Sequence, residues 1–506
     1  MQPDGAAATT LGVIDIGSNS GRVIAACVSG ASHIEVIADA GSPLRLVRDV
    51  VRSGRLNPDT IERTIQIVRG FKAVAEAAGA ERTSAVATAA VREAKNGEAF
   101  IEHARRELSI PVDIADGDQE ANFGFLGAAH GLPVEHGVVL DVGGGSLQIV
   151  HFRNRRMERS WSLPLGALRL SDRFLKADPP GRGEMRSLKE YVYERLQRAG
   201  VESLAADEHL IGTGGTIRNL GKMDRRAQTE YPISRLHGYV VERPRADDVT
   251  SVLAKTPGNA RGRLPGLNAE RADSIVGGAL VVQAVMDRLL APDLTVSGYG
   301  LREGVALSNR TQTPAPVADV RRSAVNALGA HFTSYNTALA DLRADAAMRL
   351  LESLEPRMSF ELRDGAACAA RLLDIGRSVD HYRRHAHAAR IVADANLDGY
   401  SHRLLALVSA ILLAAGEREA STKGYAPLLG PNDQVGVEQA AATIVLTEAL
   451  VRYGTSELAA SWPERRNGQV ALAVPVVDRW PLEAPIERAE RAFGVSFSLP
   501  TTANAA

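Results

Sequence analysis

The fold is decided by residues 138 to 150, which read Val-Val-Leu-Asp-Val-Gly-Gly-Gly-Ser-Leu-Gln-Ile-Val. An apolar strand ends at Asp141, three glycines and Ser146 follow, and an alternating strand then resumes. Because glycines lack a Cβ atom, their backbone N–H groups can converge on an anion. Ser146 adds a hydroxyl donor, and a carboxylate at the end of the first strand can hold a hydrated cation against that anion. The stretch therefore predicts a β-hairpin with a phosphate-sized gap at its tip.

A second copy of this pattern lies upstream, in residues 11 to 24, which read Leu-Gly-Val-Ile-Asp-Ile-Gly-Ser-Asn-Ser-Gly-Arg-Val-Ile. Asp15 again ends an apolar strand, and Gly17, Ser18 and Asn19 form the turn. Two such hairpins that face each other would hold one phosphate group from both sides.

The first hairpin opens a unit of alternating strands and helices. Apolar residues repeat at helical spacing over residues 59 to 79, with Asp59 as the expected N-cap. The run from Ser84 reads as a buried strand that leads into a short helix, and such junctions place Thr88 and Arg92 where α/β sheets bind ligands. The sequence then predicts a helix over residues 97 to 108, a strand over 112 to 114, an acidic segment over 116 to 120 and a helix over 121 to 129.

A second unit starts near Gly137 and repeats the order of the first. Its glycine run at residues 212 to 215 leads into a helix, and either contacts a nucleotide or only makes a turn. The sequence therefore predicts a duplicated α/β core with the ligand between its halves. The other elements expected in this unit are strands over residues 157 to 165 and 209 to 211, and helices over 185 to 198 and 273 to 290.

The composition changes after the linker Thr-Gln-Thr-Pro-Ala-Pro at residues 311 to 316. Ala, Leu and Arg at helical spacing predict a mainly helical domain from residue 320 to 453, and two strands around one helix are expected after it. We therefore predict three domains, over residues 1–130, 131–312 and 313–506.

Charge and cysteine content narrow the class of protein. The 59 basic and 60 acidic side chains leave a formal charge of −1, which gives no global indication of nucleic-acid or membrane binding. Two cysteines are too few for a disulfide framework, and the apolar run over residues 406 to 415 is too short to span a bilayer. The first ten residues lack the pattern of a secretory signal. We expect a cytoplasmic protein with no nucleic-acid partner and no membrane partner.

Seven segments, in this order, resemble the exopolyphosphatase and guanosine pentaphosphate phosphohydrolase family, which lies in the superfamily of actin, sugar kinases and chaperone ATPases. The matching segments are residues 15–20, 87–96, 117–121, 141–146, 162–167, 212–218 and 298–304. The resemblance implies two ribonuclease-H-like α/β domains of the actin and sugar-kinase type with a cleft between them, and a helical HD-like C-terminal domain. It also implies hydrolysis of terminal phosphoanhydrides, a divalent cation and a homodimer.

Two departures from the family pattern affect individual roles. The family often has Glu-Glu-Ala where this chain has Gln119, Glu120 and Ala121, so Glu120 inherits the role of general base. In the helical domain, Leu373 stands where a His-Asp metal motif would have its histidine, beside Asp374.

We assign roles to three groups of residues, with inorganic polyphosphate as the substrate and Mg²⁺ as the cofactor. The terminal phosphate is expected on Gly17, Ser18, Asn19, Thr88, Arg92, Gly143, Gly144, Gly145 and Ser146. The metal is expected on Asp141, with Asp15 and Glu120 as further ligands, while Glu120 activates the attacking water. A basic track for the polyanion is expected along Arg383, Arg384, His385 and Arg390.

The sequence leaves several alternatives open. Guanosine pentaphosphate is the second candidate substrate, and the core could instead belong to a kinase, to an ATP-driven switch or to a non-catalytic polyphosphate-binding regulator. The acidic residues 116 to 120 could be a solvated loop, and Arg92 could be a surface helix residue. The track could equally be an ordinary helix face, or a metal site built on His385 and His387, although histidines two apart on a helix point in different directions.

Overall fold

The computed structural model describes residues 8–416, 421–453, 464–466, 469–471 and 482–498. The chain forms two compact units. The first holds the residues up to 229 together with 236–320, and the second holds 230–235 together with the residues from 321 onward. No pattern in the sequence indicates that the short segment 230–235 packs with the helical unit.

The first sheet of the α/β unit has five strands in the order β3-β2-β1-β4-β5. Strands β1 and β2 form the hairpin predicted at residues 11 to 24, and β1 pairs in parallel with β4 on its other side. A register shift between Ala25 and Ala26 interrupts the pairing of β2 with β3. The strands are β1 (Thr9–Ile16), β2 (Ser20–Ser29), β3 (His33–Pro43), β4 (Arg82–Ala87) and β5 (Val112–Ile114).

The second sheet has six strands in the order β8-β7-β6-β9-β11-β10. Strands β8, β7, β6, β9 and β11 repeat the order of the first sheet, and β10 is added at the edge. Strand β6 pairs antiparallel with β7, which confirms the central hairpin, and parallel with β9. The predicted duplication is therefore present in the sheet topology. The strands are β6 (Gly137–Val142), β7 (Leu147–Arg153), β8 (Arg156–Leu163), β9 (His209–Thr213), β10 (Tyr239–Glu242) and β11 (Asp293–Val296).

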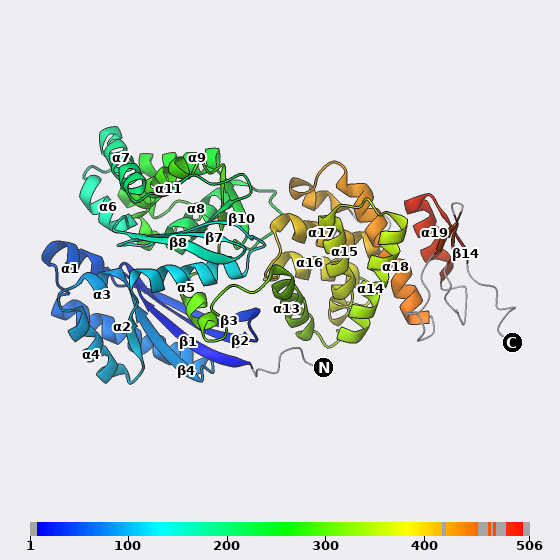
Figure 1. The fold of residues 1–506 in the computed structure, drawn as a ribbon, viewed down its shortest axis with the longest axis horizontal. Coiled ribbons are helices and arrows are strands. Elements are labelled where there is room, and N and C mark those ends of the chain that lie inside the picture. The colour runs from blue at the N-terminus through cyan, green and yellow to red at the C-terminus, as the bar shows by residue number, and fades with distance from the viewer. Residues whose placement is uncertain (1–7, 417–420, 454–463, 467–468, 472–481, 499–506) are drawn as a thin grey trace. The chain divides into compact units, whose positions relative to one another are not determined.

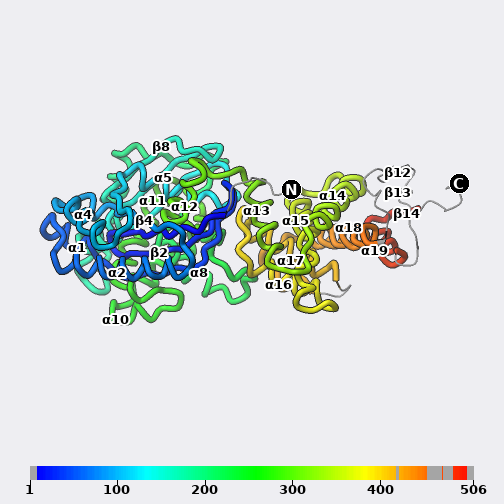
Figure 2. The backbone as a smooth tube through the Cα atoms, turned by 90° about the horizontal axis from the view of Figure 1, so that it is seen from below, coloured from blue at the N-terminus to red at the C-terminus, as the bar shows by residue number. Residues whose placement is uncertain are grey.

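Two helices, α5 (Gly117–His130) and α12 (Leu301–Ser308), lie between the sheets (Figure 1). Helix α5 packs on β6 to β9, α12 packs on β1 and β2, and the two helices contact each other, side by side in Figure 2. They approach closely because Gly127 and Gly304 face the partner helix, where a Cβ atom on either would overlap the partner's backbone. Helix α5 leads from the first sheet to the second, and α12 follows the last strand of the second sheet and packs on the first.

The acidic segment at residues 116 to 120 is not a loop. It is the first turn of α5, because Asp116 caps the helix: its carboxylate accepts from the Gln119 N–H while the Gln119 side chain accepts from the Asp116 N–H. This capping box fixes the first turn, and Glu120 lies one residue after it. In α2, the expected N-cap Asp59 is wrong, because Pro58 starts the helix and the Asn57 side chain accepts from the Asp59 N–H.

The remaining helices of the α/β unit cover the outer faces of the two sheets or connect strands. On the first sheet, α2 and α4 enclose a core that includes Ile14, Val23, Phe71 and Phe100. The helices are α1 (Leu46–Ser53), α2 (Pro58–Ala77), α3 (Ala89–Glu93), α4 (Gly97–Leu108), α6 (Ala167–Phe174), α7 (Arg182–Arg198), α8 (Gly214–Ala227), α9 (Arg243–Lys255), α10 (Gly258–Arg261), η1 (Ala269–Arg271) and α11 (Ile275–Leu289).

The second unit is mainly helical, as the sequence predicts (Figure 2). Its core joins residues from α14 to α18, including Leu351, Leu373 and Leu407, with Ile233 of the short inserted segment. The elements are α13 (Val317–Ala330), which begins in the first unit, α14 (Thr337–Leu354), α15 (Phe360–Leu372), η2 (Ile375–Ser378), α16 (Arg384–Asp394), α17 (His402–Gly416), η3 (Thr422–Leu428), α18 (Asp433–Tyr453), β12 (Glu464–Arg466), β13 (Gln469–Ala471), α19 (Glu483–Phe493) and β14 (Ser496–Ser498).

The predicted terminal αβ piece is partly described. Strands β12, β13 and β14 form a small sheet beside α19. The stretch 472–477 of the expected strand lies outside the described residues. Over the part of the chain that the structure describes, no helix is both long enough and apolar enough to cross a membrane.

Candidate functional site

The tips of the two hairpins meet in one pocket of the α/β unit, with a cavity volume of about 100 Å³. Strands β1 and β6 each end at this pocket, and helices α3, α5, α8 and α12 each begin there or close by. Predicted site residues that line it are Asp15, Gly17, Ser18, Asn19, Thr88, Glu120, Asp141, Gly143, Gly144 and Ser146. The structure therefore brings together most residues of the sequence-based assignment.

The glycine loop between β6 and β7 is held from behind by the first turn of α6. The carbonyls of Gly143, Gly144 and Gly145 accept from backbone N–H groups of residues 166–169 at 2.9–3.2 Å. Gly166 permits this contact, because a Cβ atom there would overlap the loop backbone. In a planar trans peptide the C=O and the next N–H point in opposite directions. The N–H groups of residues 144–146 therefore point away from α6.

The first hairpin tip is held in the same way by α1. The Asn19 carbonyl accepts from the N–H groups of Leu44 and Arg45 at 2.9 Å, and the Ser18 carbonyl accepts from the N–H group of Val47 at 3.0 Å. The N–H groups of residues 19 and 20 consequently point away from α1. Both halves of the duplicated core thus present backbone donors at the pocket, as an oxyanion site requires.

Three hydroxyl groups add to these backbone donors. Ser18 Oγ accepts from the Ala90 N–H at 3.1 Å, and Ser146 Oγ accepts from the Gln148 side chain at 2.8 Å. Since each oxygen already accepts a hydrogen bond, its own O–H remains available to donate to a ligand. Thr88 caps α3 without a side-chain hydrogen bond to the helix.

Glu120 projects into the pocket from the first turns of α5, and its side chain is only 10% exposed. Arg92 Nη1 lies 2.9 Å from Glu120 Oε2 and also donates to the Ala115 carbonyl at 2.5 Å. Burial raises the pKa of Glu120 to about 7, against the opposing effect of Arg92. A carboxyl group with a pKa near neutrality suits proton transfer from water at physiological pH.

Asp15 and Asp141 end the central strands β1 and β6, and both carboxylates line the pocket. Burial raises the pKa of Asp15 to about 7 and also raises the pKa of Asp141, where Arg218 and Arg271 oppose the effect. Asp15 Oδ1 is buried and has no hydrogen-bond partner among the described residues. A buried carboxylate oxygen without a donor fits a cation ligand better than a structural group.

No group of three or more His, Cys, Asp or Glu side chains within the described ranges is arranged to hold a metal ion by itself. This finding does not conflict with a magnesium site, because Mg²⁺ is commonly bound through one or two carboxylates together with substrate phosphates and water. The donor set at the pocket, two aspartates facing backbone anion donors, is of that type.

Four arginines that the sequence analysis did not assign also line the pocket. Arg218 and Arg302 lie within the segments that carry the family resemblance, at the starts of α8 and α12, so a signal for them was present. The four are Arg22, Arg218, Arg271 and Arg302. Burial lowers the pKa values of Arg218 and Arg271 only to about 10, so both stay charged at neutral pH. The pocket thus has a cationic wall for a polyanion.

Two predicted phosphate-binding residues do not line this pocket. The Gly145 carbonyl is turned toward α6 and accepts from Gly166 N–H and Arg169 Nε. Arg92 lines an adjoining pocket on the other side of Ser146. The N–H group of Gly143 donates to the Ser146 carbonyl at 3.0 Å and so stays within the loop.

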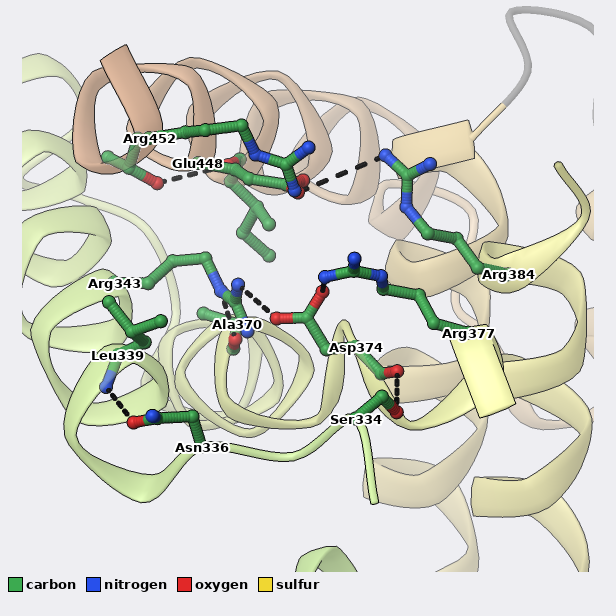
Figure 3. Close-up of polar contacts among 12 residues, drawn as sticks. Ser334, Asn336, Leu339, Arg343, Ala370, Asp374, Arg377, Arg384, Glu448 and Arg452 are labelled. Carbon is green, nitrogen blue, oxygen red and sulfur yellow. Dashed lines mark hydrogen bonds and ion pairs between the residues drawn. The ribbon is translucent and has the colours of Figure 1, made fainter. Parts of the chain in front are cut away.

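In the helical unit, Asp374 of the segment that resembles a His-Asp motif lies in an ion-pair network (Figure 3). Asp374 is bound by Arg343 Nη1 at 2.8 Å and Arg377 Nη1 at 3.3 Å, which hold its pKa below the usual range against the effect of burial. Leu373, in the histidine's place, is fully buried in the apolar core. Two guanidinium groups thus neutralise the Asp374 carboxylate.

The predicted basic track is not one continuous surface. Arg383 and Arg390, seven residues apart, are both exposed. Arg384 is partly buried and turns toward Glu448, 3.9 Å away (Figure 3). His385 Nε2 is buried without a hydrogen-bond partner among the described residues. These side chains do not share one surface because neighbouring residues on a helix point about 100° apart.

A model of the Ppx/GppA phosphatase family matches residues 23–312 of this chain. The chain belongs to the Ppx/GppA phosphatase family. It is similar to "Exopolyphosphatase 1" of Mycobacterium leprae, at 29% identity over 301 residues, which are 59% of this chain and 88% of that protein. It is also similar to "Exopolyphosphatase 2" of Mycobacterium tuberculosis, at 30% identity over 323 residues, covering 60% and 99% of the two chains.

Solved structures of Ppx/GppA proteins match the α/β part of the chain. The crystal structure of the Aquifex aeolicus family member has 31% identity and a TM-score of 0.52, over 60% of this chain and 98% of that one. A crystal structure of an exopolyphosphatase from Cytophaga hutchinsonii, at 23% identity, has a TM-score of 0.55 and supports the fold. The two mixed sheets are thus the duplicated actin-like core of the Ppx/GppA family.

Proposed function

We propose that this protein is an exopolyphosphatase that removes terminal phosphate groups from inorganic polyphosphate. The observation that carries the proposal is the position of Glu120 in one pocket with the donors of both hairpin tips and four arginines. The donors suit one terminal phosphoryl group, and the arginines suit a substrate that bears several more anionic groups. The exopolyphosphatase names of the relatives support the same substrate class.

The reaction is a hydrolysis of the terminal phosphoanhydride. The N–H groups of residues 19, 20, 144 and 146, with the hydroxyls of Ser18, Thr88 and Ser146, orient the terminal phosphoryl group. Glu120 takes a proton from water, whose oxygen forms a bond to phosphorus while the bridging P–O bond breaks. The electron pair of that bond leaves with the shortened chain, which is itself a stable anion and needs little general acid.

Asp141, with Asp15 and Glu120 as further candidate ligands, would hold Mg²⁺ at this site. A bound Mg²⁺ neutralises charge on the phosphoryl oxygens. The unpartnered Asp15 Oδ1 and the position of both aspartates at the pocket support this assignment. Within the chain itself, Arg218 and Arg271 lie close enough to Asp141 to influence its ionisation, which places positive charge beside the same phosphate groups.

For the second unit, we propose a degenerate HD-like domain that holds the chain of the substrate rather than cutting it. The neutralised Asp374 argues against a second metallohydrolase site, and the exposed Arg383 and Arg390 are the remaining candidates for contact with a polyanion. The family resemblance supports the domain boundaries near residues 130 and 312 and a homodimer. Free Cys27 and Cys368 are consistent with a cytoplasmic location.

The test is release of orthophosphate from purified protein given long polyphosphate, tripolyphosphate, guanosine pentaphosphate or ATP under identical conditions with Mg²⁺. We expect the highest kcat/KM with polyphosphate. A higher kcat/KM with guanosine pentaphosphate would make that nucleotide the substrate and leave the assignment of the site unchanged. Phosphorylation of an acceptor at the expense of ATP would show that the protein is a kinase and not a hydrolase.

A further inference from the structure

A second pocket lies beside the first in the α/β unit, with a cavity volume of about 510 Å³. Ser146 lines both pockets. The second pocket is formed by the end of α3, the start of α5, and the link from β8 to α6.

The walls of this second pocket carry donors suited to an oxyanion. Within the described chain, no hydrogen bond uses Nε or Nη2 of Arg92, because its contacts to Glu120 and Ala115 both go through Nη1. Arg169 donates from Nε to the Gly145 carbonyl at 3.0 Å and from Nη2 to Glu93 at 2.5 Å, so Nη1 remains.

Further polar groups line the pocket, and the carboxylates near it already have cationic partners. Ser146, Ser162 and Gly117, at the first turn of α5, also line this pocket. The carboxylate on the wall, Glu93, is engaged by Arg169, and Glu120 is engaged by Arg92. Neither arginine is fully exposed: their side chains are 26% exposed for Arg92 and 21% for Arg169.

The position of Glu120 relates this pocket to the reaction. Glu120 lines the first pocket, while its partner Arg92 lines the second, so the pair stands at the boundary between them. In an in-line displacement, the phosphoryl group moves away from the leaving chain and toward the attacking water. If Glu120 positions that water, the new orthophosphate moves toward Glu120 and therefore toward the second pocket.

We propose that the second pocket binds the orthophosphate product and is its way out, while the shortened polyphosphate stays in the first pocket. This inference rests on the proposed hydrolysis of polyphosphate. The oxygen of the attacking water leaves in the orthophosphate, and the electron pair of the broken bridging bond stays on the shortened chain. Separate positions for the two products allow the chain to advance by one unit without dissociating.

Inhibition by orthophosphate tests the proposal on the full-length protein. Rates are measured with labelled tripolyphosphate at several concentrations of unlabelled orthophosphate. Because the product would bind beside the substrate rather than in its place, we expect orthophosphate to lower kcat even at saturating tripolyphosphate. Inhibition that saturating substrate fully overcomes would overturn the proposal.

Variants identify the pocket. Arg169→Gln and Ser162→Ala should each raise the inhibition constant for orthophosphate by a larger factor than they raise the KM for tripolyphosphate. For Arg169→Gln, which removes a charged donor, we expect the inhibition constant to rise about tenfold. Arg173→Gln, an exposed residue of the same helix, is the matched control. Equal changes in the inhibition constant and KM would place Arg169 in the substrate site instead.

Direct binding provides a readout that does not require turnover. Calorimetry would follow orthophosphate binding to the full-length protein saturated with a methylene-bridged triphosphate analogue. We expect one orthophosphate per chain, lost in Arg169→Gln but kept in Arg173→Gln. If the wild-type protein hydrolyses tripolyphosphate but binds no orthophosphate beside the analogue, only the second pocket is refuted. If it does not hydrolyse tripolyphosphate at all, the proposed function itself fails.

Discussion

Glu120 at the start of α5 and Arg92 in α3 form a 2.9 Å ion pair. Arg92 also donates to the Ala115 carbonyl, just before α5 begins, so one guanidinium positions both the helix start and the carboxylate. The orientation of Glu120 toward the pocket thus depends on a residue that does not itself line that pocket.

Glu120→Gln retains the size and hydrogen-bonding capacity of the side chain but removes the base. We expect turnover to fall by roughly 10² to 10⁴ while polyphosphate binding changes little. Steady-state rates, together with binding measured by calorimetry, check this. Asp118→Asn, an exposed position on the same helix turn, is the control. Turnover near that of the parent protein would transfer the role of base to another group, with Asp141 the first candidate.

Asp141→Ala should abolish activity mainly through loss of the cation, because the remaining carboxylates would face the substrate's charge without a neutralising partner. Raising the Mg²⁺ concentration should restore activity only in part. The measurement is a Mg²⁺ titration of turnover beside thermal unfolding of the same sample, which separates loss of metal from loss of fold. An unchanged Mg²⁺ dependence would make Asp141 a structural turn residue.

Replacing both Arg383 and Arg390 by Gln should raise the KM for long polyphosphate and leave the KM for tripolyphosphate unchanged. Each arginine that contacts the polyphosphate chain releases counterions, by analogy with proteins on nucleic-acid backbones. The double variant releases fewer counterions, so its KM for long polyphosphate should depend less steeply on salt. The substitutions are preferable to removing the helical unit, because residues 230–235 pack with that unit and would lose their partners.

The exposed Arg357 is the matched control for the double variant. The basic track is refuted if the double variant, the Arg357→Gln control and the parent protein have the same KM for long polyphosphate and the same dependence of that KM on salt. Dimerisation or a purely structural role would then account for the helical unit.

Acid should destabilise the helical unit through His385. Burial, helped by Arg384, Arg488 and Arg343 and opposed by Asp374, lowers the pKa of His385 to about 4. The unfolded chain binds this proton near pH 6.5, so stability is lost as the pH falls from about 6.5 to about 4 and then levels off. The loss is at most about 3 kcal/mol, from 1.36 kcal/mol per pKa unit.

Chemical denaturation of the helical unit at several pH values measures this loss. His385→Gln should flatten the pH dependence of the unfolding free energy between pH 4 and 6.5. His381→Gln, in the exposed turn before the same helix, should leave it unchanged. The idea fails if the parent protein and His385→Gln lose the same stability on acidification.

Local patterns were sufficient to predict the two hairpins and the repeated order of elements, since the glycine turns and strand alternation lie within short stretches of the chain. The start of α5 was missed because Asp116 caps the helix through Gln119, and acidic residues in a first turn resemble an acidic loop. Arg22 and Arg271 reach the pocket from a strand and a 3₁₀ turn far apart in the sequence, which only the tertiary fold brings together.

The helical unit shows a different limit of sequence reasoning. Spacing suggested that Arg383, Arg384 and Arg390 share one face, but the ion pair of Arg384 with Glu448 joins α16 to α18, two helices that are far apart in the sequence. The change at Leu373 was visible in the sequence, whereas the arginines that neutralise Asp374 come from α14 and η2 and could not be inferred from it.

The glycines Gly127 and Gly304 fix how closely α5 and α12 approach each other. Helix α5 connects the first sheet to the second, and α12 follows the second sheet and packs on the first, so both helices join the halves of the core. A methyl group at Gly127 would meet the Gly300 carbonyl, and one at Gly304 would meet the Phe123 carbonyl. Either substitution would force the two helices apart, and because Gly300 and Arg302 at the start of α12 line the pocket, the change would reach the site from positions outside it.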